Sequence, residues 1–145
     1  YEIETMTKGI NAIRDRMKDI QIRMADRNAA VPVSNKEKSL FDTLEVCEEM
    51  YARGYRVGNV DLYKSLATDF SVSKEDDHII IPPFNCVDGL GGNVAQSIVN
   101  AREQGRFLSK EDLFSRTQLS QTLARKLEVL GCLEGMQEKN QMSLF

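Results

Sequence analysis

A pair of closely spaced glycines stands directly before a stretch with helical periodicity, and this arrangement suits the binding of phosphate. Gly89 and Gly91 flank Leu90, and because glycine adopts positive φ at little cost, the spacing permits a sharp turn with Leu90 pointing inward. Apolar residues then recur at positions 94, 98 and 101, as on one face of an amphipathic helix. The first amides of such a helix have no intrahelical acceptor, and the positive end of the helix dipole attracts anions. The pattern therefore predicts a turn that binds phosphate through backbone amides.

The full pattern over residues 87–102 is typical of a helix-hairpin-helix DNA-binding element. Backbone amides contact phosphate oxygens and not base edges, so we expect binding to double-stranded DNA that is independent of sequence. The predicted DNA-backbone contacts are Gly89, Gly91, Gly92, Asn93, Val94, Arg102 and Lys110. The competing interpretation is a purely structural turn, since Gly-Leu-Gly before a helix also occurs in unrelated proteins.

Composition indicates a soluble globular protein. The 145 residues are 41% hydrophobic and 28% charged, with a net charge of −3, so the chain as a whole has no positive excess to attract nucleic acid. Residues 84–126, however, hold six cationic side chains against four acidic ones. No apolar run is long enough to cross a bilayer, and no signal peptide is recognisable. Because the first residue is not Met, we expect a fragment of a longer protein.

Three widely spaced cysteines, Cys47, Cys86 and Cys132, indicate reduced thiols and a cytoplasmic location. An iron–sulfur cluster normally needs four cysteine ligands, so it is disfavoured here. The single histidine, His78, has no cysteine or paired carboxylate at a metal-ligand spacing and is expected to be an exposed strand residue. We therefore predict no metal site and no cofactor.

The N-terminal part of the chain is predicted to form an αα-hairpin. Apolar residues recur at three- and four-residue steps over residues 3–24, which predicts one long amphipathic helix in which Gly9 costs ~1 kcal/mol relative to Ala. After a loop, the Ser-Asn-Lys-Glu sequence at residues 34–37 has the spacing of a capping box. A second helix is therefore expected from about 35 to 53, with Gly54 just past its end.

The periodicity changes between the αα-hairpin and the glycine turn. Residues 55–57, 67–72 and 78–81 are candidates for short strands, and the polar residues between the last two favour a small β-hairpin. The prolines Pro82-Pro83 end this region and confine the next helix to about 84–87.

A second helix–turn–helix unit without glycines follows the first, with helices expected at 109–116 and 121–130. The two units are predicted to share a small core made of Leu90, Val94, Ile98, Leu119, Leu123 and Leu127. The second unit is expected to support the first and to contact phosphate weakly or not at all, through Lys110, Arg116 or Arg125. The predicted fold is mainly α with a small β-hairpin: an αα-hairpin, a tandem helix-hairpin-helix domain and a flexible C-terminal tail.

The last residues are polar but end on large apolar side chains. Such a tail either docks on its own domain or presents a short linear motif to a partner. The motif residues are Gln141, Met142, Ser143, Leu144 and Phe145.

Several separate motifs make the chain resemble the C-terminus of the PolC-type DNA polymerase III alpha subunit. The motifs that carry the resemblance are Gly54-Tyr55, Val60-Asp61-Leu62-Tyr63, Ala67-Thr68-Asp69-Phe70, Ile81-Pro82-Pro83-Phe84-Asn85, Gly89-Leu90-Gly91, Phe107-Leu108-Ser109-Lys110-Glu111-Asp112-Leu113 and the terminal pentapeptide Gln141-Met142-Ser143-Leu144-Phe145. The resemblance covers nearly the whole chain.

What this resemblance implies is a noncatalytic part of a Gram-positive replicative polymerase. In such proteins the palm aspartates that bind Mg²⁺ and the 3'–5' exonuclease lie in other parts of the chain. Residues 1–83 would be the distal fingers, 84–136 the tandem helix-hairpin-helix domain that binds primer–template duplex, and 137–145 a tail that binds the sliding clamp. The resemblance assigns the clamp contact to Gln141–Phe145.

Two departures from the general hairpin pattern suggest weak DNA binding: Asp88 stands where Pro is common, and Asn93 where Lys is common. Two other functions compete with the polymerase interpretation. One is a helix-hairpin-helix DNA glycosylase with Asp112 as its catalytic acid, although Asp112 also fits a first-turn helix position. The other is a plain protein-interaction module.

Overall fold

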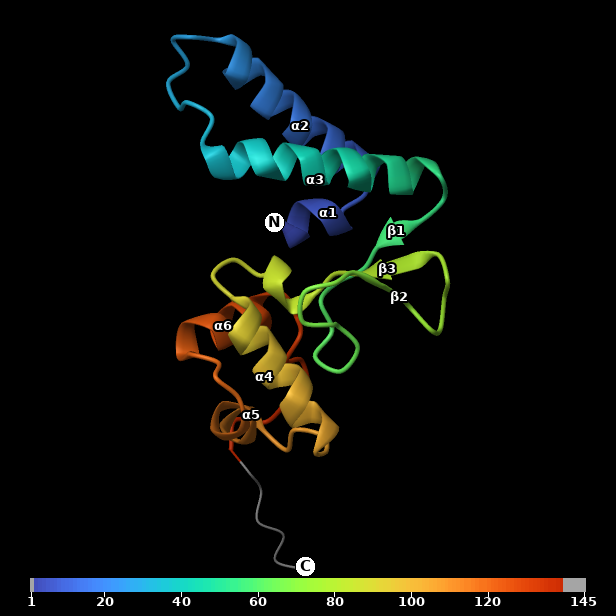
Figure 1. The fold of residues 1–145 in the computed structure, drawn as a ribbon, viewed down its shortest axis with the longest axis vertical. Helices are drawn as coiled ribbons and strands as arrows, with labels where there is room; N and C mark the ends of the chain where they lie inside the picture. The colour runs from blue at the N-terminus through green and yellow to red at the C-terminus, as the bar shows by residue number, and fades with distance from the viewer. Residues whose placement is uncertain (1, 140–145) are drawn as a thin grey trace, which may run out of the picture. The chain divides into compact units, whose positions relative to one another are not determined.

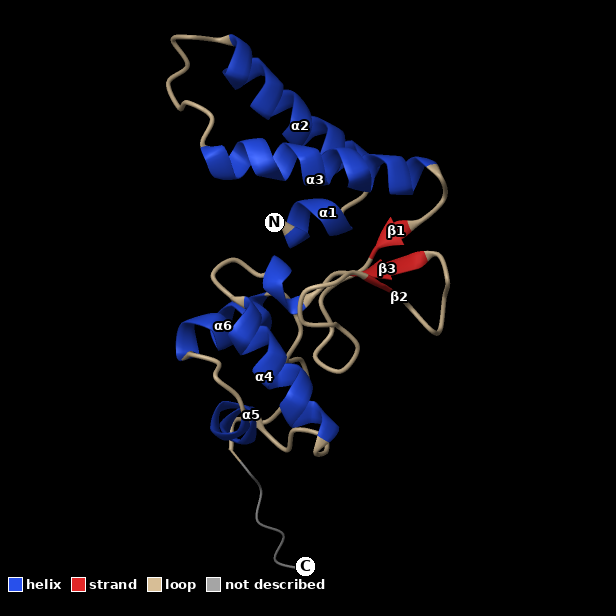
Figure 2. Ribbon diagram, viewed as in Figure 1, coloured by secondary structure: helices blue, strands red, loops and turns tan. Residues whose placement is uncertain are grey.

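The computed structural model describes residues 2–139. In order, the elements are α1 (Ile3–Thr7), α2 (Ile10–Ala25), α3 (Asn35–Ala52), β1 (Arg56–Val57), β2 (Ser71–Val72), β3 (Ile79–Ile81), the 3-10 helix η1 (Phe84–Cys86), α4 (Gly92–Glu103), α5 (Lys110–Arg116) and α6 (Gln121–Val129), as Figures 1 and 2 show. The mainly α fold class predicted from the sequence is confirmed.

The chain divides into two compact units. The N-terminal unit is the chain up to Gly58 together with Val72–Ile80, and the C-terminal unit is Asn59–Ser71 together with the chain from Ile81 onward. The division differs from the predicted domain boundary after residue 83, because residues 59–71 pack with the later helices. Val60 and Leu62 are buried, and Ser65 Oγ donates a 2.9 Å hydrogen bond to the carbonyl oxygen of Pro82.

The predicted αα-hairpin is present in the N-terminal unit, where α2 and α3 lie side by side (Figure 1). The buried core of this unit consists of Met6, Ile13, Ile20, Leu40, Leu44, Cys47 and Val57. The predicted capping box begins α3: the Glu37 amide donates to Ser34 Oγ, and the Ser34 amide donates to the Glu37 carboxylate. Gly54 follows the helix with φ of 92°, as expected of a residue just past a helix end.

The prediction of one long first helix is wrong, because Gly9 divides it into α1 and α2. Gly9 has φ 106° and ψ 178°, a conformation that is essentially restricted to glycine. The carbonyl oxygen of Met6 accepts a 2.7 Å hydrogen bond from Tyr51 Oη, which anchors α1 to α3. The apolar face also ends early, since Met24 is exposed.

The three strands form one small sheet in the order β1-β3-β2. β2 and β3 are neighbours, as the predicted β-hairpin requires, although both are shorter than expected. The sequence did not indicate that β1 would pair in parallel with β3, with Arg56 opposite Ile79 and Val57 opposite Ile80. The prolines after β3 lead into η1, as predicted.

The C-terminal unit is built around α4, α5 and α6 and the turns that join them (Figure 1). Its buried residues include Leu90, Ala95, Ile98, Ala101, Phe107, Leu113, Leu119, Ala124, Leu127 and Leu133. Four of the six predicted core residues are among them, whereas Val94 and Leu123 are only half-buried. Cys47, Cys86 and Cys132 carry free thiols, and burial raises the pKa of Cys47 to about 11 and that of Cys132 to about 12.

Candidate nucleic-acid interface

The glycine turn before α4 has the geometry of a tight hairpin. Gly89 has φ of 82°, and the Leu90 amide then donates a 3.0 Å hydrogen bond to the carbonyl oxygen of Val87. Leu90 is buried, so it points inward as predicted. Gly91 has φ −77° and ψ 171°, which any residue can adopt. Positive φ is therefore needed at the first glycine only, and a Cβ at Gly91 would meet no atom within 4 Å.

The N-terminus of α4 is open. Gly91 is its N-cap and supplies no side-chain cap, and the first helical hydrogen bond runs from the Ala95 amide to the Gly91 carbonyl oxygen at 3.0 Å. The amides of Gly92 and Asn93 precede that bond, and both residues are exposed. These donors, at the positive end of the helix dipole, suit a phosphate oxygen.

The second helix–turn–helix unit differs at the same position. The N-cap of α6 is Ser120, whose Oγ accepts a 3.2 Å hydrogen bond from the Leu123 amide. The turn before it is tied to α4, because the Gln118 amide donates to Ser97 Oγ at 3.0 Å and Ser97 Oγ donates to the Val94 carbonyl oxygen at 2.6 Å. The second turn is thus attached to α4, and the start of α6 is partly satisfied by a side chain.

Arg102 lies at the opposite end of α4 from the glycine turn and makes contacts within the protein. Its Nη1 donates to the carbonyl oxygens of Ser65 at 2.6 Å and Leu62 at 3.2 Å, and its guanidinium lies over the Phe84 ring. Burial lowers the pKa of this half-buried arginine. The predicted DNA contact of Arg102 stays a prediction, and its surroundings favour a structural role.

Lys110 also forms ion pairs within the C-terminal unit. Its Nζ lies 2.5 Å from Glu128 Oε1 and 2.8 Å from Glu138 Oε1, and these carboxylates, Glu128 first, raise its pKa. The backbone there is paired as well, because the Lys110 amide donates to the Gln137 carbonyl oxygen and the Glu111 amide to that of Glu138. The two carboxylates thus already offset the charge of Lys110 within the protein.

Arg116, another predicted weak contact, caps the C-terminal end of α4 with its side chain. Its guanidinium donates to the carbonyl oxygens of Ala101, Gly105 and Arg106 and lies over the Phe107 ring. Arg106 in turn lies 4.2 Å from the centroid of the Tyr63 ring. Much of the positive excess of residues 84–126 therefore contacts carbonyl groups, carboxylates and rings of the protein itself. Among the three weak candidates, only Arg125 is an exposed residue.

Lys126 is the functional candidate that sequence reasoning missed. Its Nζ donates a 2.8 Å hydrogen bond to the carbonyl oxygen of Asp88 and lies 3.8 Å from that residue's carboxylate. A Cβ at Gly89 would lie 3.5 Å from the same Nζ and 3.7 Å from a methyl carbon of Leu123. Leu123 was predicted to pack into the shared core, and a residue three positions later lies on the same helix face. That spacing was the signal for placing Lys126 beside the turn.

Asp112 has the surroundings of a helix-capping residue. Its amide donates to Ser109 Oγ at 3.0 Å, and its carboxylate accepts from the Leu108 amide at 2.9 Å and from Arg116 at 3.0 Å. The hydrogen bond from Leu108 is the main cause that lowers its pKa. An ionised carboxylate held in this way stabilises the start of α5, which supports the first-turn interpretation over a catalytic one.

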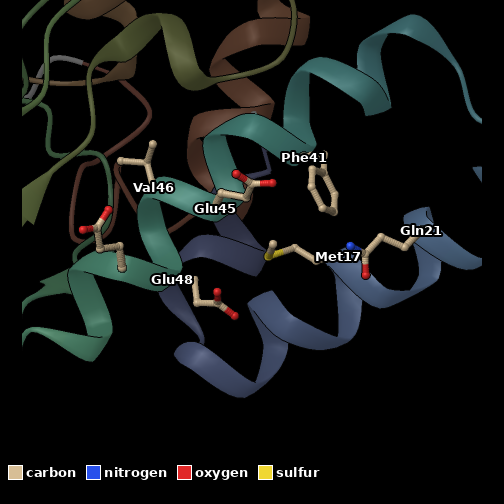
Figure 3. A pocket seen from close by; sticks show the side chains of 7 residues that line it. Met17, Gln21, Phe41, Glu45, Val46 and Glu48 are labelled. Atoms are coloured by element: carbon tan, nitrogen blue, oxygen red, sulfur yellow. The ribbon is translucent and has the colours of Figure 1, made fainter.

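A groove between α2 and α3 has chemistry opposite to that of a DNA interface. It encloses about 430 Å³ and is lined by Met17, Gln21, Phe41, Glu45, Val46, Glu48 and Glu49 (Figure 3). Its lining includes three glutamates, of which Glu48 is paired with Arg14 at 3.0 Å and Glu49 with Arg53 at 2.6 Å, so part of this negative charge is offset within the protein. Elsewhere in the N-terminal unit, Asp76, Asp77 and His78 lie close together on an exposed turn, with His78 Nδ1 2.8 Å from Asp77 Oδ1, so His78 does have carboxylates beside it.

The clamp-binding residues predicted from the tail, Gln141–Phe145, lie outside the described residues. Within residues 2–139, none of the helices has both the length and the hydropathy that a membrane span requires.

Comparison with known proteins identifies the class of this chain. Residues 54–142 match the helix-hairpin-helix motif family, and the chain belongs to that family. The match begins well before the glycine turn, in agreement with the packing of residues 59–71 in the C-terminal unit.

The relatives are polymerases. Over all 145 residues the chain is 50% identical to the PolC-type DNA polymerase III of Oceanobacillus iheyensis, 48% to that of Bacillus subtilis and 45% to that of Streptococcus sanguinis. The chain spans only about a tenth of the length of these relatives, 10%, 10% and 9% respectively. The resemblance found in the sequence motifs is confirmed.

Proposed function

We propose that this chain is the noncatalytic C-terminal part of a PolC-type replicative polymerase, which binds the backbone of primer–template duplex and tethers the enzyme to the sliding clamp. The metal-dependent nucleotidyl transfer, with its Mg²⁺, and the proofreading would be carried by other parts of that polymerase. The observation that carries the duplex contact is the open N-terminus of α4, where Gly92 and Asn93 are exposed residues and no side chain caps the helix.

The mode of binding follows from these donors. Amides at a helix N-terminus bind the oxygens of a phosphate group and do not contact the bases, so duplex affinity should not depend on DNA sequence. Asp88 and the neutral Asn93 keep the local charge low, so we expect weak binding with a small number of phosphates. Each phosphate neutralised contributes about −0.9 to the slope of log K against log salt.

Gly91→Ser tests the duplex contact most sharply. Serine fits the extended backbone of Gly91 and a Cβ there meets no atom within 4 Å, so its Oγ can cap α4 as Ser120 caps α6. Stability should therefore stay the same or rise by a few tenths of a kcal/mol. Duplex affinity should fall because the added hydroxymethyl group stands at the helix start and its Oγ, placed as in Ser120, occupies the amide of Val94, one of the predicted phosphate donors. Urea unfolding and fluorescence anisotropy with a labelled duplex measure the two effects.

Ser120→Gly is the matched control, because it opens the corresponding N-terminus of α6. It should lower stability slightly and leave duplex affinity close to that of the parent chain. A Gly91→Ser variant that is folded and binds duplex as well as the parent chain would refute the assignment of phosphate to this helix end.

The tether rests on the terminal residues alone. Deletion of Leu144 and Phe145 should abolish binding to purified sliding clamp and leave duplex binding unchanged, since the deleted side chains would be the apolar anchors. Equal clamp affinity of the intact and shortened chains, measured by surface plasmon resonance, would exclude the tail as the tether.

A further inference from the structure

We infer that the ammonium of Lys126 is the cation of the phosphate site at the first hairpin, supplied from the second helix–turn–helix unit. The inference rests on the proposed duplex binding and names a residue for it. Lys126 belongs to α6, whereas the amides of the site belong to the turn and the start of α4.

The position of the ammonium carries the inference. Lys126 Nζ lies 2.8 Å from the Asp88 carbonyl oxygen and 3.5 Å from the place of a Cβ on Gly89, so a positive charge stands against the turn itself. The Lys126 side chain is 40% exposed, which leaves the ammonium accessible to a ligand from solvent. An ammonium has three donors, and the hydrogen bond to Asp88 uses one of them.

The charges at the turn explain why this cation matters. The Asp88 carboxylate would repel a phosphate, and Lys126 Nζ lies 3.8 Å from it, close enough to offset its charge. Asn93 at the start of α4 adds no charge. Lys126 thus both offsets an acid and contributes a donor. The second helix–turn–helix unit would therefore contribute a residue to the binding site as well as support it.

The test compares Lys126→Gln, Lys126→Arg and the parent chain in duplex titrations at several salt concentrations. Removal of one phosphate contact should weaken binding roughly five- to tenfold and reduce the magnitude of the salt slope by about 0.9, and Lys126→Arg should restore most of both. Lys38→Gln, which removes an exposed charge from α3 in the N-terminal unit, should leave the salt slope unchanged. Weaker binding by Lys126→Gln with an unaltered slope would mean that Lys126 only holds the turn in place, and would overturn the inference.

Asp88→Asn separates offsetting the acid from direct contact. In that background no acid remains to be offset, so a direct contact predicts that adding Lys126→Gln still reduces the slope. Identical titrations of Asp88→Asn with and without Lys126→Gln would overturn the inference. Failure of the parent chain to bind duplex would overturn both this inference and the proposed function, whereas parent binding that is lost in Gly91→Ser but unaffected in Lys126→Gln would overturn the inference alone.

Discussion

Arg102 donates a 2.6 Å hydrogen bond from Nη1 to the carbonyl oxygen of Ser65, which joins the end of α4 to the segment before β2. A second bond reaches the Leu62 carbonyl oxygen, and the Phe84 ring lies under the guanidinium. An arginine that the sequence pattern offered as a DNA contact therefore connects two parts of the C-terminal unit.

Arg102→Met should lower the free energy of unfolding of the C-terminal unit by roughly 1–3 kcal/mol, because two carbonyl groups lose a charged donor. Below its unfolding transition the variant should bind duplex with the same salt slope as the parent chain. Arg125→Met, at an exposed position of α6, is the stability control. A normal stability with a reduced slope for Arg102→Met would show that Arg102 contacts DNA instead.

Gly9→Ala should destabilise the N-terminal unit by about 1–3 kcal/mol, although alanine is the better helix former. The reason is the φ of 106° at Gly9, which alanine adopts only with strain. Gln21→Ala, an exposed change in α2, should alter stability by less than about 0.5 kcal/mol in the same urea titration. A gain of about 1 kcal/mol for Gly9→Ala would instead indicate a continuous helix.

Alanine at the two glycines around the start of α4 should have opposite effects on stability. Gly89 has φ of 82°, so Gly89→Ala should cost about 1–2 kcal/mol. Gly92 lies in the first turn of α4, and a Cβ there would meet only the Thr68 methyl carbon at 3.8 Å, an ordinary contact. Gly92→Ala should therefore stabilise the unit by about 0.5–1 kcal/mol. Thermal unfolding of both variants checks the difference in sign.

The αα-hairpin should lose stability at acid pH through Glu37. Hydrogen bonds from Arg23 and then Arg16 lower the pKa of Glu37 from 4.5 to about 2. Because the folded pKa is below the unfolded one, this stabilisation is complete above about pH 4.5 and is lost as the pH falls towards 2. Glu37→Gln should lower stability at pH 7 and flatten the pH dependence between these values, whereas Glu45→Gln should not. Thermal unfolding followed by circular dichroism at pH 7, 4 and 3 measures both, and an unchanged acid profile for Glu37→Gln would contradict the prediction.

The sequence was sufficient to predict the elements whose signals are local. The capping box at Ser34 and Glu37 and the glycine turn before α4 involve residues a few positions apart, so their spacing contains the needed information. Gly9 is the local exception. It divides the first helix because its φ is positive, and the sequence shows only that a glycine can adopt such a φ, not that it does.

Long-range contacts were not predictable in the same way. The parallel pairing of β1 with β3 joins segments more than twenty residues apart. A strand of two residues is too short for its pattern of apolar and polar side chains to indicate which strand it pairs with. The cationic residues show the same limit. Whether Arg102, Arg116 or Lys126 faces solvent or a carbonyl oxygen depends on loops that approach these side chains in the fold. Arg102 and Arg116 donate to carbonyl oxygens of the protein itself, which the net charge over residues 84–126 could not reveal.

The backbone pairing of Gln137 and Glu138 with the start of α5 has a mechanical consequence for the tether. From Glu138 the chain takes three Cα steps to Gln141, at most about 11 Å when fully extended. If the pentapeptide binds the clamp as proposed, this short linker limits how far the clamp can move from the duplex-binding unit. The clamp would be held close to the duplex-binding unit, and lengthening the linker with glycine and serine would lower the effective concentration of the clamp at the DNA without changing either contact.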